Sequence, residues 1–497
     1  MTDVVIGCDI GTQSCKGLAM DQAGTVVARA SETYGVAYPQ PGWAQQEPRD
    51  WELALGRVIG SLVATVGRGR GRVAAIGIAG QVDGILPVDT DDASMGPALI
   101  WMDRRATAEA AELARLFDPA AVHARTGGNI DASHGGPKIA WLRAQERAGL
   151  APAADAYLMP VSFAVARLTG ERVIDPSSAS TTLLWDLHTA DWAPDLMAAV
   201  GVAPGDLGAV LPAAAIAGNV RPDIAAGLGL GRRVPVVVGT GDEHAACLGA
   251  GATEPGIVCD ITGTAEPVAA AARTALVDPS RSLETHPHPA PDRWILENPG
   301  FVSGGSTRWL ADSILGIPEA QLFALAAEAP PGSDGLVFVP ALGGAVTPRW
   351  NDRARGTFHG VRLGHDRRHL CRAVLEGCAF ALRDIVDVLD ALGLAGERIR
   401  VLGGGARDPL WMRIKSDVMG RVVERLAEPE ATAYGAALLA ATGIGWYPDA
   451  AAAAAQTARV LPQVDQPDPG HHAVYVDAYD RYRRIYDALE PIDMGTP

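Results

Sequence analysis

An acid ends a predicted strand near the start of the chain, and a glycine and two hydroxyl side chains follow it in the stretch "DIGTQSCK". Glycine lets backbone N–H groups approach the oxygens of a phosphate, and a hydroxyl adds a further donor. Asp9, at the end of the strand, has the chemistry to hold Mg²⁺ directly or through water. An ordinary β-hairpin with a polar turn is the alternative, and no GxxxxGK[ST] loop is present. The candidate phosphate contacts are Gly11, Thr12, Gln13 and Lys16.

Two later glycine-containing turns have the same character. "ITGTAEP" places Gly263 and Thr264 after a strand, and "VLGGGARDP" places three glycines between a strand and an amphipathic helix. Small residues there would let a base and ribose lie against the backbone, near a helix N-terminus. A tight strand–helix turn is the alternative. The candidate nucleotide contacts in the second turn are Gly404, Gly405, Ala406 and Asp408.

A single acid, Asp242, stands at a predicted strand–helix junction in "GTGDEHAACLGAG". Asp is a favoured residue at helix N-termini, so Asp242 is a candidate N-cap. A carboxylate at that position is also a candidate general base, and the helix dipole would help to keep it ionised. From position alone both roles stay open.

Composition narrows the classes of protein that the chain can belong to. The 497 residues carry a formal charge of -16, which argues against general binding to nucleic acid or to anionic membranes. The six cysteines form no CxxC pair, no signal peptide is visible, and no run of 18 apolar residues appears. We therefore expect a cytoplasmic protein. Two histidines in Thr285–Pro291 resemble metal ligands, but the prolines predict an extended loop, and we expect no metal there.

Alternating strands and helices predict α/β layers. For example, Trp51, Leu55, Val58, Ile59 and Leu62 recur with helical spacing. "CDIGTQSCKGLAM" at Cys8 is echoed by "CDITGTAEPVAAA" at Cys259. Two similar halves, residues 1–245 and 246–497, are the simplest interpretation of this echo.

The order of the three turns resembles the ATP-binding duplicated domains of the actin, hexokinase and Hsp70 superfamily. Gly356–Glu376 is similar, position by position, to the second signature of FGGY carbohydrate kinases, and "PKIAWL" (Pro137–Leu142) resembles the core of the first. Within the family, "AGQVDG", "IWMDRR" and "GTGDEHAA" are most similar to the xylulokinases. The resemblance covers almost the whole chain.

This resemblance implies two duplicated actin/hexokinase-like (ribonuclease H-like) α/β domains with a catalytic cleft between them. It implies ATP and Mg²⁺ as cofactors, a small sugar or polyol as the partner, and Asp242 as the general base. The N-terminal domain would bind the sugar and carry the first phosphate turn, and the C-terminal domain would bind ATP. The expected reaction converts D-xylulose to D-xylulose 5-phosphate. The oligomeric state stays open, with a homodimer as one option.

The sugar contacts that the resemblance implies depart from the xylulokinase pattern at two places. Val82 and Asp83 replace a Met-His pair, and Glu243 replaces an Asn. Both changes cast doubt on D-xylulose and leave room for ribulose, xylitol, arabinitol or erythritol. A sugar-responsive regulator without activity and an ATP-dependent binding protein also stay open. The implied substrate contacts are Gln81, Val82, Asp83, Asp103, Asp242 and Glu243. Of these, Asp103 either contacts the sugar or orients the loop, and an N-cap of the helix at Ala106 is the alternative.

Overall fold

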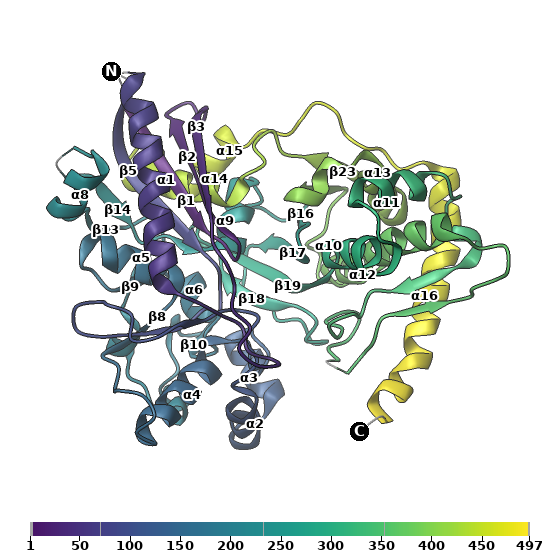
Figure 1. Cartoon of the computed structure of the whole chain (residues 1–497), viewed down its shortest axis with the longest axis horizontal. Coiled ribbons are helices and arrows are strands. Elements are labelled where there is room, and N and C mark those ends of the chain that lie inside the picture. Colours follow the sequence, from purple (N-terminus) through teal and green to yellow (C-terminus); the bar gives the residue numbers. More distant parts are fainter. Residues whose placement is uncertain (1–2, 70, 232, 352, 496–497) are drawn as a thin grey trace.

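Two mixed β-sheets, one in each half of the chain, form the framework of the protein (Figure 1). The computed structural model describes residues 3–69, 71–231, 233–351 and 353–495. The N-terminal half lies at the left of Figure 1 and the C-terminal half at the right, where the final helix runs along the outer edge. This arrangement confirms the predicted α/β architecture with two domains.

The first sheet has the order β13-β14-β5-β1-β2-β3, with β15 paired to β5. In β1 almost every residue is buried, because helix α1 covers one face of the sheet and α14 the other. Its strands are β1 (Asp3–Ile10), β2 (Ser14–Asp21), β3 (Val26–Thr33), β5 (Arg72–Gly80), β13 (Ile216–Asn219), β14 (Pro235–Val237) and β15 (Thr240–Gly241).

Helices and short strand pairs surround the first sheet. The predicted helix around Trp51 is α1, and its apolar stripe is buried. The helices of this half are α1 (Pro48–Arg68), α2 (Thr107–Leu116), α3 (Pro119–Thr126), α4 (Gly135–Arg147), α5 (Pro160–Thr169), α6 (Pro176–Ser180), α7 (Pro194–Val200), α8 (Pro222–Leu228) and α9 (Asp242–Gly249). The short strands are β4 (Gln45–Gln46), β6 (Leu86–Val88), β7 (Ala98–Leu99), β8 (Ala156–Leu158), β9 (Val173–Ile174), β10 (Trp185–Asp186), β11 (Asp191–Trp192) and β12 (Ala209–Val210).

The second sheet repeats the plan of the first. β16 pairs with β17 antiparallel and with β22 parallel, as β1 pairs with β2 and β5. The echo between Cys8 and Cys259 is therefore a structural repeat, since both lie on the central strand of such a set. The order is β18-β19-β17-β16-β22-β23. Its strands are β16 (Ile257–Ile261), β17 (Ala265–Ala272), β18 (Glu284–Pro287), β19 (Trp294–Val302), β22 (Arg398–Leu402) and β23 (Val422–Arg425).

The helices of the C-terminal half surround the second sheet, except for α14 and α15, which lie with the first sheet. They are α10 (Gly304–Arg308), α11 (Glu319–Ala327), α12 (Arg367–Ala391), α13 (Pro409–Met419), α14 (Ala431–Gly443), α15 (Ala450–Thr457) and α16 (Pro469–Gly495). A separate strand pair joins β20 (Val337–Val339) to β21 (Thr357–His359). The FGGY-like stretch Gly356–Glu376 supplies β21 and the start of α12, where Glu376 accepts hydrogen bonds from Gly332 N and Ser333 Oγ.

Helix α14 packs on β1, β5 and α9 of the N-terminal half through small side chains. A Cβ at Gly435 would lie 1.9 Å from the carbonyl oxygen of Ala245, so only glycine permits this approach. The predicted division after residue 245 falls inside α9, and it stays a prediction. The small residues of "ATAYGAALLAA" thus give close helix packing at the join of the two halves.

The six cysteines are all buried and unpaired. No single helix in the described ranges is long and apolar enough to cross a membrane. Two consecutive helical segments, Gly304–Leu315 and Glu319–Ala327, reach the necessary length and hydropathy only when they are counted together, and the chain bends by 96° between them.

Candidate active site

Asp242 is the first residue of α9, directly after the short strand β15. The N-cap is Gly241, so the expectation that Asp242 caps the helix is wrong by one residue. Its Oδ1 accepts hydrogen bonds from the backbone N–H groups of Val82 (3.2 Å) and Glu243 (3.0 Å). Burial raises the pKa of Asp242 to about 6, and these two hydrogen bonds act against the rise. At neutral pH the carboxylate is therefore mostly ionised.

Asp9 lies at the end of β1, on the strand next to β5. Burial and the charge of Asp242 raise the pKa of Asp9 well above its ordinary value, while Lys16 lowers it. Its Oδ1 is buried without a hydrogen-bond partner among the described residues. Two carboxylates that raise each other's energy, one of them with an unsatisfied buried oxygen, form a site where a cation would be stabilised.

Two aromatic side chains donate hydrogen bonds to the first glycine turn, Gly11–Thr12. Tyr34 donates to the carbonyl of Gly11 (2.6 Å), and Trp101 Nε1 donates to Thr12 Oγ1 (2.9 Å). Gln13 is exposed, and Lys16 pairs with Glu430 at 2.8 Å. The structure thus places Asp9 close enough to Asp242 for the two charges to interact.

The two other turns lie at the edge of the second sheet. Gly263 and Thr264 are exposed, and their carbonyls accept from Gly304 N and Gly305 N at the start of α10. The glycine turn forms a short 3-10 helix, Gly404–Arg407, in which Ala406 is half-buried. Asp408 is the N-cap of α13, since its Oδ1 accepts from Leu410 N and Trp411 N. If Asp408 contacts the nucleotide, as the sequence suggested, the contact has to be made by Oδ2.

A buried ion cluster behind Gly263 was not predicted from the sequence. Lys415 Nζ lies 2.5 Å from Asp260 Oδ2, 2.5 Å from Thr262 Oγ1 and 3.0 Å from Glu266 Oε1. Asp260 occupies in the repeat the position that Asp9 occupies in β1. In the C-terminal half the carboxylate of Asp260 is therefore paired with Lys415, whereas in the N-terminal half Asp9 Oδ1 has no hydrogen-bond partner among the described residues.

The loop Gln81–Asp83 runs beside Asp242. Gln81 is buried and donates to Gln46 Oε1, and Val82 packs against Gly241. Asp83 has a positive φ of 59°, a conformation that Asp tolerates better than most residues. Its carbonyl accepts from Lys138 Nζ at 2.7 Å. Burial lowers the pKa of Lys138 to about 7.

Asp103 is fully buried, and both its oxygens are occupied. Arg105 pairs with it at 2.8 Å, and Ala44 N donates to Oδ2 at 2.7 Å. The N-cap of α2 is Ala106, so Asp103 does not cap that helix. The geometry is that of a residue that orients the loop, the second of the roles that the sequence suggested for it.

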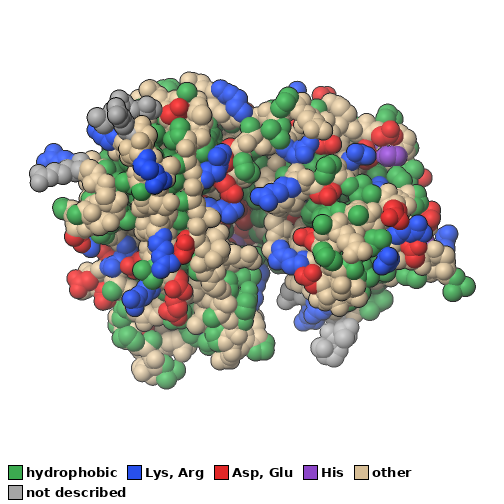
Figure 2. Space-filling view, turned by 45° about the horizontal axis from the view of Figure 1, so that its top comes forward, with side chains coloured by type: hydrophobic (Ala, Val, Ile, Leu, Met, Phe, Trp, Pro, Cys, Tyr) green, Lys and Arg blue, Asp and Glu red, His purple; other side chains and the backbone are tan. Residues whose placement is uncertain are grey.

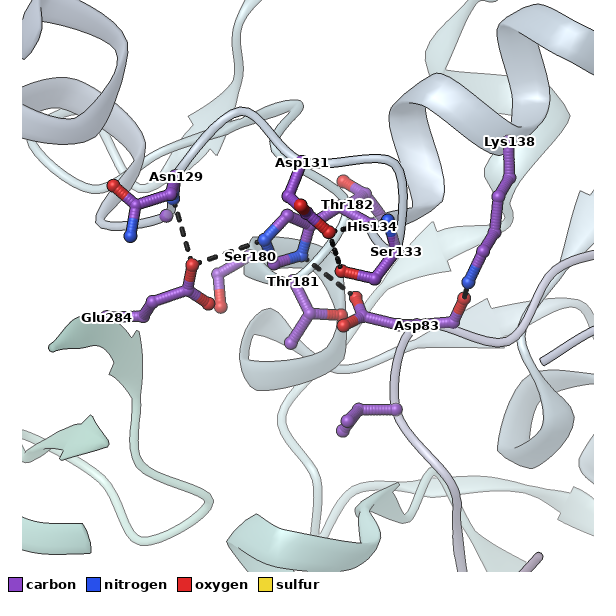
Figure 3. A network of polar contacts seen from close by, with 12 residues as sticks. Asp83, Asn129, Asp131, Ser133, His134, Lys138, Ser180, Thr181, Thr182 and Glu284 are labelled. Atoms are coloured by element: carbon purple, nitrogen blue, oxygen red, sulfur yellow. Dashed lines mark hydrogen bonds and ion pairs between the residues drawn. The ribbon is translucent and has the colours of Figure 1, made fainter. Parts of the chain in front are cut away.

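A polar bridge across the two halves is the feature that sequence reasoning missed. His134, the N-cap residue of α4, lies between Asp83 and Glu284 of β18, with each ring nitrogen 3.2 Å from a carboxylate oxygen (Figure 3). Burial opposes its charge, but Glu284 and Asp83 outweigh burial and raise the pKa of His134 to about 10. The sequence analysis singled out the stretch "PKIAWL", which contains Lys138 and begins three residues after His134, but it did not single out His134 itself.

Glu243 follows Asp242 and is half-buried. Burial and the charges of Glu297, Asp242, Asp83 and Glu284 raise its pKa well above the ordinary value. The site is thus rich in carboxylates, with His134 as a cationic bridge. Figure 2 shows a cleft between the two halves on the face that it presents.

Residues 4–249 match the N-terminal domain of the FGGY family of carbohydrate kinases, and residues 259–444 match its C-terminal domain. A glycerol kinase of Gloeobacter violaceus is 33% identical, over 97% of this chain and 97% of its own. A xylulose kinase of Escherichia coli is 30% identical, over 98% and 99%. The crystal structure of a xylulose kinase from Rhodospirillum rubrum has a TM-score of 0.88 and 33% identity, over 99% and 100%.

Proposed function

The chain belongs to the FGGY family of carbohydrate kinases, and we propose that it transfers a phosphoryl group from ATP to the terminal hydroxyl of a ketopentose of the D-xylulose type. The observation that carries the proposal is the placement of Asp242. It starts α9, it is fixed by Val82 N and Glu243 N, and its charge interacts with that of Asp9, which precedes the first phosphate turn. A base beside a phosphate site is the arrangement that phosphoryl transfer to a hydroxyl requires.

Asp242 would accept the proton of the sugar hydroxyl through Oδ2, since both hydrogen bonds found in the described residues go to Oδ1. Phosphoryl transfer passes through a loose transition state, so the protein mainly has to position the groups and stabilise charge. The base need not be strong. It has to be ionised and within about 3 Å of the hydroxyl.

Magnesium fits the carboxylate of Asp9, because its buried Oδ1 has no partner in the described chain and oxygen is the ligand that Mg²⁺ prefers. Bound there, the ion would neutralise phosphate charge. The backbone at Gly11–Thr12 and at Gly263–Thr264 would donate to phosphate oxygens. The glycine turn Gly404–Arg407 would take the adenosine. Residues 1–245 would then bind the sugar, and residues 246–497 the nucleotide.

A polyhydroxylated substrate is supported by the polar groups that continue beyond Asp242. Asp83, Glu243 and the bridge through His134 and Glu284 offer more acceptors than the reacting hydroxyl alone needs. The acidic residues at 83 and 243 support a second candidate, a kinase for a polyol, because carboxylates accept pairs of hydroxyls without needing a ketone. The six buried, unpaired thiols support a reducing compartment such as the cytoplasm.

A coupled assay of ADP release with D-xylulose, D-ribulose, L-ribulose, xylitol, D-arabinitol, erythritol and glycerol tests the proposal. We expect kcat/KM for D-xylulose to exceed that for each polyol at least tenfold. A higher value for a polyol would move the assignment to the second candidate. ADP release with none of them, together with sugar binding in calorimetry, would contradict the kinase proposal.

A further inference from the structure

Three buried side chains next to the active site come from both halves of the molecule. His244 lies on α9, two residues after Asp242, whereas His286 and Glu297 lie on β18 and β19. These two strands pair antiparallel with Glu284 opposite Glu297, so His286 is on the same face as both, two residues along β18. His244 and His286 are fully buried, and Glu297 is 3% exposed.

The polar atoms of these side chains point toward one common region, but the distances between them are too long for hydrogen bonds. Glu297 Oε1 lies 3.6 Å from His244 Nε2 and 3.5 Å from His286 Nε2. One nitrogen or oxygen from each of the three residues lies within 4.8 Å of the others. Four buried atoms of these three residues have no hydrogen-bond partner in the described chain: His244 Nδ1, His244 Nε2, His286 Nε2 and Glu297 Oε2. Unsatisfied buried polar atoms are rare, so a cluster of four indicates a missing partner.

Ser180 fixes the chemistry of the His286 ring. The hydroxyl of Ser180 donates to the carbonyl of Ser177 (2.6 Å) and lies 2.7 Å from His286 Nδ1. A hydroxyl that donates to Ser177 accepts from Nδ1–H of His286, so Nε2 is the ring nitrogen that faces Glu297 Oε1, 3.5 Å away. A proton or a metal ion has to lie between these two atoms.

We propose that His244, His286 and Glu297 bind a divalent transition-metal ion of the Zn²⁺ class, which ties α9 to the β18–β19 hairpin. Zn²⁺ binds two histidines and one glutamate in known sites, and ligand atoms about 2.1 Å from a tetrahedral ion are about 3.4 Å apart. The observed 3.5 and 3.6 Å are close to that spacing. The hydrogen bond from Nδ1 to Ser180 is the outer contact that a metal-bound histidine usually has.

A sugar is not the missing partner, because His244 and His286 are fully buried and Glu297 is 3% exposed, which puts the three side chains out of reach of a molecule of that size. The extended segment Thr285–Pro291 was expected to be a loop without metal, but its first residues form strand β18. The other ligands lie at positions 244 and 297, too far along the chain for the local pattern to show them. The site is separate from Asp9, where Mg²⁺ is proposed.

The test uses tag-free, full-length protein that is stripped with a chelator, loaded with Zn²⁺ or Co²⁺ and desalted. We expect about one ion per chain, a visible Co²⁺ spectrum of tetrahedral nitrogen and oxygen ligation, and a higher Tm with Zn²⁺ than without. His286→Gln and Glu297→Gln should each weaken Zn²⁺ binding at least 100-fold. His188→Gln, at an exposed histidine, and Asp9→Asn should keep it.

The unaltered protein alone can overturn the proposal. If it retains no Zn²⁺ after desalting, gives no tetrahedral Co²⁺ spectrum and shows no change in Tm, the site does not bind metal. Equal Zn²⁺ retention by folded His286→Gln and Glu297→Gln variants would place the ion elsewhere. Since none of these readouts measures ADP release, they are independent of the proposed kinase reaction.

Discussion

At the scale of single residues, the site differs from a simple base in a polar pocket because five carboxylates gather in it. They are Asp83, Asp242, Glu243, Glu284 and Glu297. Burial and then the charges of the other four raise the pKa of Glu243, while His134 compensates the charges of Asp83 and Glu284. The identity of the residues around Asp242, more than Asp242 itself, should therefore decide which substrate is bound.

Asp83→Asn should weaken binding of the sugar without affecting that of ATP. The amide keeps one acceptor for His134 but loses the charge, and a hydrogen bond to a charged group contributes about 1.5–3 kcal/mol, which corresponds to a roughly 10- to 100-fold rise in KM. Steady-state kinetics with each substrate varied in turn measures this. Asp91→Asn, at an exposed turn, is the control. An unchanged KM for the sugar would remove Asp83 from the binding site.

His134 should make the stability of the protein depend on alkaline pH. Its pKa in the folded state, about 10, is above the ordinary 6.5, so the folded state binds the proton more tightly than the unfolded state. The stabilisation is complete below about pH 6.5 and is lost as the pH rises through 10. The Asp83 and Glu284 carboxylates that face the ring cause this shift.

Thermal unfolding of the unaltered protein and of His134→Gln between pH 6 and 10 measures the effect. The difference in Tm between the two should shrink steadily as the pH rises, because other groups that titrate in this range are common to both. A constant difference would show that His134 is neutral in the folded protein.

At the scale of elements, packing depends on buried charges within the C-terminal half and on small residues where α14 crosses to the first sheet. Lys415 of α13 links β16 and β17 through Asp260 and Glu266, and all three side chains are fully buried. Helix α14 lies against β1 and α9 through glycine and alanine.

Lys415→Met should destabilise the protein by about 3–5 kcal/mol, because it leaves two buried acids without their cation. Lys16→Met is the matched control. It removes a lysine that is 43% exposed and paired with Glu430, and we expect less than about 1 kcal/mol. Urea denaturation gives both values, and similar losses in the two variants would contradict the account of the buried cluster.

Gly435→Ala should destabilise the protein by about 1–3 kcal/mol, because the added methyl group meets the Ala245 carbonyl at 1.9 Å. Gly60→Ala serves for comparison. It lies inside α1 with no atom within 4 Å of its Cβ position, and it should stabilise by about 0.5–1 kcal/mol. Chemical denaturation of both variants is the measurement. A neutral Gly435→Ala would mean that α14 can move away from α9 without loss.

At the scale of the whole molecule, local patterns predicted what is local. Strand–turn signals gave the three glycine turns, and the repeated Cys-Asp-Ile stretch predicted the duplicated sheet. The bridge from His134 to Glu284 was not predicted. His134 and Glu284 are 150 positions apart, so their contact depends on how the two halves pack. A local periodicity in the sequence carries no information about that packing.

The same limit explains the two errors at the ends of helices. A favoured residue stood at Asp242, but the chain enters α9 with Gly241 extended, which moves the cap by one position. Asp103 preceded a predicted helix, yet its carboxylate turns inward to Arg105. In both cases a backbone N–H far along the chain holds the carboxylate: Val82 N donates to Asp242, and Ala44 N donates to Asp103.

The central claim is that the two halves together form a kinase in which Asp242 is the base. Asp242→Asn keeps the shape and the acceptor oxygen but cannot take a proton at neutral pH, so sugar-dependent ADP release should fall about 10²- to 10⁴-fold. ATP and sugar should still bind in calorimetry. The most direct measurement is therefore sugar-dependent ADP release by Asp242→Asn beside the unaltered protein. A fall of that size with binding retained is the predicted result, and turnover within tenfold of the unaltered protein would contradict the account.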